Sequence, residues 1–132
     1  MAEYRVLLVD DEEEFVSALS ERLMLRGIEV DSALNGEEAL ASLKEKEFEV
    51  VILDVMMPGL GGLEVLRQIK STYPNTQVIL LTGHGSTREG IEGMRLGAFD
   101  YLIKPVDIEE MLEKMKEAAN TVGTDRSHGE KG

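Results

Sequence analysis

Cysteine is absent from this chain of 132 residues, and lysine and arginine are scarce beside aspartate and glutamate. The lack of cysteine excludes disulfide bonds and thiolate metal sites, and a cytoplasmic location fits it. The net charge of −12 disfavours nucleic acid and anionic membrane as direct partners. It suits a protein that meets divalent cations and basic protein surfaces.

Long hydrophobic runs are also absent, so we expect no membrane-spanning helix, and no secretory signal is visible. The composition is that of a globular protein, with 42% hydrophobic and 30% charged residues. The length predicts one domain with its own core, over residues 1–120. From Thr121 to Gly132 the residues are mostly small or polar, which predicts a flexible tail or the stump of a linker.

Short apolar runs of strand character alternate with segments of helical period. The predicted strands are Tyr4–Val9, Ile28–Ala33, Phe48–Leu53, Gln77–Leu81 and Phe99–Ile103. Predicted helical faces occur at Phe15, Ala18, Leu19 and Leu23; at Ala39, Leu40 and Leu43; at Leu63, Leu66 and Ile69; at Ile91, Met94 and Ala98; and at Ile108, Met111, Leu112 and Met115. This alternation predicts an α/β fold, a single doubly wound sheet of five parallel strands with five helices.

The fourth helical segment contains two interior glycines, Gly90 and Gly93. Each costs a helix about 1 kcal/mol relative to alanine. We therefore expect a marginal helix that is easily reshaped. The alternative is that tertiary packing holds it rigid.

Aspartates stand where two apolar strands end. Asp10 and Asp11 follow the first strand, and Asp54 follows the third. Open α/β sheets bind ligands at the edge where such strands end, so these carboxylates should lie together. Two carboxylates 4 Å apart repel by about 4 kcal/mol at an effective dielectric near 20. The cluster therefore needs a divalent cation or protonation.

Two further polar residues follow strands at the same edge, Thr82 after the fourth strand and Lys104 after the fifth. Hard oxygen ligands without histidine or cysteine favour Mg²⁺, with Mn²⁺ also possible, over zinc. A carboxylate, a metal ion, a lysine and a hydroxyl are the groups needed to form and stabilise an aspartyl phosphate.

The acidic run Asp10–Glu14 has a plainer interpretation, in which acids favour a helix N-terminus and Asp11 is the cap. We prefer that interpretation for the three glutamates and give it less weight for the aspartates. Thr82 could be an ordinary strand residue, and Lys104 a solvated surface charge. His84 and His128 are read as solvated side chains and not as metal ligands, although His84 lies close enough to Thr82 to affect a phosphoryl group.

Five motifs occur in order at the strand ends: Asp10-Asp11, Asp54-Val-Met-Met-Pro58-Gly59-Leu-Gly-Gly62, Thr82-Gly83-His84-Gly85, Gly97-Ala98-Phe99-Asp100-Tyr101 and Lys104-Pro105. Together they resemble the receiver domains of bacterial two-component response regulators, over about residues 4 to 120. Among these, the chain is similar to receivers of the nitrogen-regulatory activator type. The resemblance implies a flavodoxin-like fold with strand order 2-1-3-4-5.

The resemblance also implies roles for the polar residues. Asp54 would be the phosphoacceptor, attacking a phosphohistidine on a sensor histidine kinase or phosphotransfer protein. Asp10, Asp11, Asp54 and the backbone carbonyl of Met56 would hold Mg²⁺. Lys104 would pair with the phosphoryl group.

A conformational switch is implied as well, in which Tyr101 turns inward as Thr82 shifts. Pro105 would follow a cis peptide bond that aims the lysine. The output face would comprise the fourth helix, fifth strand and fifth helix, at about residues 86 to 119. That face could form a phosphorylation-dependent homodimer or be plainly solvated, and the output partner and the kinase stay open.

Two other function classes remain. One is a Mg²⁺-dependent phosphohydrolase with an aspartyl-phosphate intermediate. Such enzymes carry an Asp-x-Asp-x-Thr signature after the first strand, whereas this chain has Asp10-Asp11-Glu12 there. The other is a phosphorylation-independent interaction domain, against which the intact set of polar residues argues. The leading prediction is a phosphorylation-activated receiver that is not a turnover enzyme.

Overall fold

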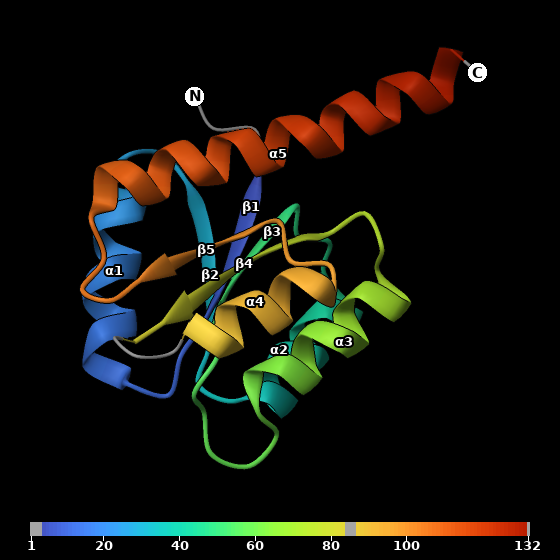
Figure 1. Ribbon diagram of the computed structural model, residues 1–132. Helices are drawn as coiled ribbons and strands as arrows, with labels where there is room; N and C mark the ends of the chain where they lie inside the picture. Colours follow the sequence, from blue (N-terminus) through green and yellow to red (C-terminus); the bar gives the residue numbers. More distant parts are fainter. Residues whose placement is uncertain (1–3, 84–86, 132) are drawn as a thin grey trace.

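The computed structural model describes residues 4–83 and 87–131 and consists of strands and helices in alternation (Figure 1). The strands are β1 Arg5–Val9, β2 Glu29–Ala33, β3 Val50–Asp54, β4 Gln77–Thr82 and β5 Asp100–Ile103. The helices are α1 Glu13–Met24, α2 Gly36–Glu45, α3 Gly62–Thr72, α4 Thr87–Arg95 and α5 Ile108–Lys131. The predicted alternation is confirmed, with most boundaries within two residues of the expected ones.

All five strands pair in parallel, in the order β2-β1-β3-β4-β5. Helices α1 and α5 cover one face of the sheet, and α2, α3 and α4 cover the other (Figure 1). The predicted doubly wound fold with strand order 2-1-3-4-5 is confirmed.

The sheet separates two hydrophobic cores, and residues along each central strand alternate between them. In β1, Leu7 and Val9 pack toward α2 and α3, whereas Val6 and Leu8 pack toward α1 and α5. Every residue of β3 is buried because both faces of the sheet are covered. The two strands that lead to the aspartates are therefore enclosed on both faces.

The predicted apolar face of α1 is partly wrong. Val16, Leu19 and Leu23 are the buried residues, whereas Ala18 is exposed and Phe15 is only half-buried. The buried face therefore includes Val16 in place of Phe15 and Ala18.

The predicted face of the fourth helical segment is partly wrong. Ile91 is 53% exposed and Met94 41% exposed, whereas Ala98, which follows α4, is buried as expected. Among the residues of α4 whose burial is described, 88–95, the buried ones are Gly90 and Gly93. A Cβ atom at Gly93 would overlap the Leu80 side chain of β4, so the glycine lets the helix approach the sheet. The prediction assigned burial to the apolar residues. In α4 the residues that face the sheet are instead those small enough for the helix backbone to lie close to β4.

Helix α5 continues to Lys131 and projects beyond the sheet (Figure 1). Its backbone is therefore helical over most of the segment where we expected a flexible tail from Thr121 onward. Use of that segment as a linker stays a prediction. Across the described residues, each helix is too short or too polar to cross a lipid bilayer.

Candidate functional site

Three aspartates meet at the edge of the sheet where β1 and β3 end. Asp10 follows β1, Asp54 is the last residue of β3, and these strands are neighbours in the sheet. Carboxylate oxygens of Asp10, Asp11 and Asp54 all lie within 4.8 Å of one another. Asp10 is fully buried and Asp54 is 6% exposed, whereas Asp11 faces solvent. The predicted acidic cluster is present.

The two buried aspartates are held in the same way. Asp10 Oδ1 accepts a hydrogen bond of 2.9 Å from the backbone N–H of Glu12, and Asp54 Oδ1 accepts one of 3.0 Å from that of Met56. Each Oδ1 is thus fixed by the N–H two residues on, as in an Asx-turn. The second oxygen of each carboxylate is left facing Lys104.

Close packing of α3 shapes the loop that follows Asp54. The backbone N–H of Gly62 donates to the carbonyl of Val55 at 3.2 Å. A Cβ atom at Gly62 would overlap the backbone carbonyl of Asp54. Glycine at this position therefore lets α3 begin directly against the end of β3.

Lys104 follows β5 and brings one ammonium group to the cluster. Its Nζ lies 2.7 Å from Asp10 Oδ2, 2.9 Å from Glu12 Oε1 and 3.8 Å from Asp54 Oδ2. The Phe15 ring of α1 lies against it, with 4.7 Å from Nζ to the ring centroid. The peptide bond from Lys104 to Pro105 is cis, as predicted. Lys104 is therefore not a solvated surface charge.

Thr82 and Tyr101 come from β4 and β5. Thr82 ends β4, is 2% exposed, and donates its hydroxyl to the carbonyl of Leu102 in β5 at 3.3 Å. The half-buried Tyr101 ring lies beside α4, where a Cβ atom at Gly90 would meet it at 3.5 Å. The Thr82 hydroxyl is thus turned toward β5, and the switch through these two side chains stays a prediction.

The local charges shift two pKa values. Burial and the nearby Asp10 charge raise the pKa of Asp54 to about 6, against the opposing effects of the Met56 N–H and Lys104. Burial alone would lower the pKa of Lys104, but the close contacts of its ammonium with the Asp10 and Glu12 carboxylates outweigh it and the pKa is raised. One ammonium thus contacts three neighbouring carboxylates, those of Asp10, Glu12 and Asp54.

The residues present fit a hard divalent cation. The cluster consists of carboxylates only, and carboxylate oxygens are the ligands that Mg²⁺ prefers. Asp10 Oδ2 is buried and accepts no hydrogen bond of good geometry, although Lys104 lies beside it. Asp10, Asp11 and Asp54 could therefore hold a metal ion.

Glu12 and Phe15 are the site residues that the sequence analysis missed. We read Glu12 as an acid that favours the helix N-terminus, but as N-cap of α1 it makes no capping bond with its side chain. That side chain pairs with Lys104, which lies 92 positions away, and no local pattern indicates such a contact. The suggestion about His84 lies outside the described residues.

Comparison with known proteins agrees with this geometry. The family model for the response regulator receiver domain matches residues 6–116. The uncharacterized transcriptional regulatory protein YkoG of Bacillus subtilis is 41% identical over 124 residues, covering 94% of this chain and 54% of its own length. The regulatory protein AtoC of Escherichia coli is 38% identical over 107 residues, covering 81% of this chain and 23% of its own.

Solved structures agree as well. A response regulator receiver domain protein from Clostridium thermocellum is 37% identical with a TM-score of 0.86, covering 89% of this chain and 95% of that one. NtrX from Brucella abortus is 29% identical with a TM-score of 0.91, covering 98% of this chain and 29% of that one. The chain spans about half the length of the first curated relatives it matches. The motifs, the fold and a family match over most of the sequence show that this chain belongs to the response regulator receiver domain family.

Proposed function

We propose that this chain accepts a phosphoryl group on Asp54, from a sensor histidine kinase or a phosphotransfer protein, in a Mg²⁺-dependent reaction. The observation that carries the proposal is the convergence of three aspartates within 4.8 Å, with the Lys104 ammonium beside them. Receiver domains are signalling proteins, and response regulators work with histidine kinases. A cytoplasmic location belongs to the same proposal.

In the reaction, one carboxyl oxygen of Asp54 attacks the phosphorus of a phosphohistidine. The new O–P bond forms as the P–N bond to the imidazole breaks, and the imidazole nitrogen leaves with the electron pair and takes up a proton. Asp54 must be ionised to attack, and its pKa of about 6 leaves it mostly so at neutral pH. Lys104 then pairs with the phosphoryl oxygens.

Mg²⁺ would be held by Asp10, Asp11, Asp54 and the backbone carbonyl of Met56. When bound, it offsets the repulsion among the carboxylates and neutralises charge on the incoming phosphoryl oxygens. Without a cation, the buried carboxylates would repel the anionic phosphoryl group. The acidic cluster therefore explains why the reaction would need a metal.

The switch runs from Thr82 to Tyr101. After phosphorylation the Thr82 hydroxyl gives up the Leu102 carbonyl and donates to a phosphoryl oxygen, and the Tyr101 ring turns inward from its place beside Gly90. A hydrogen bond to a charged group contributes about 1.5–3 kcal/mol, whereas reversing a 1:99 equilibrium needs about 5.5 kcal/mol. Lys104 and the repacking of α4 must supply the difference.

The surface that reads this switch comprises α4, β5 and α5. Ile91 and Met94 of α4 and Ile103 of β5 are exposed there, with Ile103 49% exposed. These side chains could meet a second copy after phosphorylation or an output domain of a longer protein.

Incubation with acetyl phosphate tests the proposal, with intact mass as the readout. We expect one phosphoryl group on the wild-type chain when Mg²⁺ is present and none when EDTA removes it. Asp54→Asn should remain unmodified under both conditions. Modification of that variant, or an unmodified wild-type chain, would contradict the proposal. Steady-state turnover of small phosphate esters would instead revive the phosphohydrolase alternative.

A further inference from the structure

We propose that Glu12 is a positioning residue that holds the Lys104 ammonium away from Asp54 and competes with the phosphoryl group for it. The inference rests on the proposed function of Asp54 and adds a residue to that site. Glu12 then lowers the affinity of the site for a phosphoryl group. The strength of the contact between Glu12 and Lys104 determines the size of this decrease in affinity.

The distances show which carboxylates hold the lysine. Lys104 Nζ is 2.9 Å from Glu12 Oε1 and 2.7 Å from Asp10 Oδ2, but 3.8 Å from Asp54 Oδ2. The ammonium thus lies on the β1–α1 side of the site. Among the described residues, Lys104 is the only cationic side chain that contacts Asp54. To pair with a phosphoryl group on Asp54, its ammonium would therefore have to move toward that side of the site.

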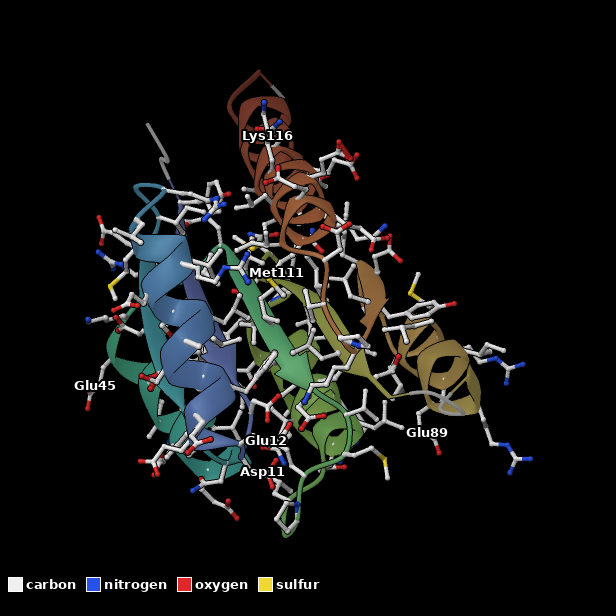
Figure 2. All side chains as sticks on the ribbon, turned by 90° about the vertical axis from the view of Figure 1, so that its left-hand side faces the viewer. Asp11, Glu12, Glu45, Glu89, Met111 and Lys116 are labelled. Atoms are coloured by element: carbon white, nitrogen blue, oxygen red, sulfur yellow. The ribbon has the colours of Figure 1, made fainter. Side chains whose placement is uncertain are left out.

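The backbone of Glu12 is fixed, so its side chain is the part that can release the lysine. Its N–H donates to Asp10 Oδ1, and its carbonyl accepts from Val16 N–H at 3.0 Å in the first turn of α1. The side chain of Glu12 is 65% exposed. Figure 2 shows Glu12 beside Asp11 at the start of α1.

Phe15, in the first turn of α1, completes the contact. Its ring centroid lies 4.7 Å from the Lys104 ammonium, close enough for a cation–π interaction. Glu12 and Phe15 therefore hold the lysine between a charge and a ring face.

Cation binding would leave Glu12 as the main competitor. Asp10 is a candidate ligand of the metal, and a carboxylate that binds a cation has less charge to offer Lys104. Glu12 lies outside that cluster and keeps its full charge. Since an exposed ion pair is weak, the competition should change affinity by a few fold and not abolish it.

Three variants separate this contact from the general effect of charge. Glu12→Gln removes the charge, whereas Glu12→Asp keeps the charge and shortens the side chain by one methylene, which withdraws it from Lys104. Glu13→Gln removes the same charge from the neighbouring exposed residue, for which no contact with Lys104 occurs among the described residues. Glu12 is largely exposed, so these changes leave the core intact.

The experiment titrates the full chain with beryllofluoride, a phosphoryl mimic, in excess Mg²⁺. We expect Glu12→Gln and Glu12→Asp to bind it about two- to fivefold more tightly than the wild type. Glu13→Gln should match the wild type. If Glu12→Asp binds beryllofluoride as the wild type does, the effect is one of charge alone and the inference is overturned. The inference is also overturned if both Glu12 variants bind beryllofluoride no more tightly than the wild type.

A second readout needs neither metal nor phosphoryl group. The NMR signal of the Lys104 side chain should change in both Glu12 variants and stay unchanged in Glu13→Gln, because only Glu12 contacts the ammonium. An unchanged signal in the Glu12 variants overturns the inference. A wild-type chain that binds no beryllofluoride overturns the proposed function and this inference together, whereas wild-type binding that the Glu12 variants leave unaltered overturns this inference alone.

Discussion

Residue type and burial disagree in opposite directions in two regions of the molecule. A charged residue is buried where β3 ends, whereas apolar residues are exposed on α4. In β3 every residue is buried, the final aspartate included. In α4 the apolar Ile91 and Met94 are exposed while the glycines are buried. A strand covered on both faces buries whatever it contains, whereas a helix that lies very close to a sheet buries only what is small enough to fit.

The two regions also differ in the unfavourable interactions that they contain. The strand ends bring like charges together in a buried place, which the raised pKa of Asp54 reflects. The region of α4 and β5 exposes apolar side chains to water, among them Ile91 and Ile103. Under the proposed function, phosphorylation of the first region changes the packing of the second.

The largest expected effect on stability belongs to the charged region. Burial raises the pKa of Asp54 in the folded chain above its unfolded value of 3.8, so folding takes up protons and stability falls as pH rises from about 4 to about 6. Without metal, Asp54→Asn should raise the free energy of unfolding by about 2–3 kcal/mol at neutral pH, at 1.36 kcal/mol per pKa unit. Urea denaturation measures this gain.

The dependence on pH is the control for that prediction. Near pH 4 the gain should almost vanish, because Asp54 is then protonated in the folded wild type. A gain of the same size at both pH values would mean that the variant changes packing and not charge.

Adding Mg²⁺ should stabilise the wild type by a similar amount. A ligand present at one hundred times its dissociation constant contributes about 2.7 kcal/mol when it binds only the folded chain. Asp11→Asn removes one exposed carboxylate of the cluster and should lose most of that gain, whereas Glu14→Gln should retain it. Thermal unfolding with and without Mg²⁺ makes the comparison, and equal gains in all three proteins would argue against the metal site.

The smallest expected changes in stability come from replacing the two glycines of α4, and they should have opposite signs. At Gly93 an added methyl group overlaps the buried Leu80, so Gly93→Ala should cost about 1–3 kcal/mol. At Gly90 it meets the Tyr101 ring at an ordinary contact distance, so Gly90→Ala should stabilise the helix by up to about 1 kcal/mol.

Amide hydrogen exchange across residues 87–96 tests the same pair. Exchange should slow in Gly90→Ala and quicken in Gly93→Ala. Equal responses would show that both glycines act only through helix propensity.

Much of the fold and of the site could be predicted because the signals are local. The apolar strands with their terminal aspartates, as in Val50–Asp54, indicated both the sheet and the acidic cluster. The outward face of α4 could not be predicted, because it depends on how closely Gly93 approaches Leu80. The pairing of Glu12 with Lys104 joins two loops far apart in the sequence, and only the folded chain brings them together.

Borohydride reduction of the chain after acetyl phosphate treatment tests the central claim most directly, because it converts an aspartyl phosphate to homoserine at the modified position. Peptide mass mapping should then find homoserine at position 54 alone, and only when Mg²⁺ was present. Homoserine at position 10 or 11, or at 54 without Mg²⁺, would contradict the assignment of Asp54 as the acceptor in a metal-dependent site.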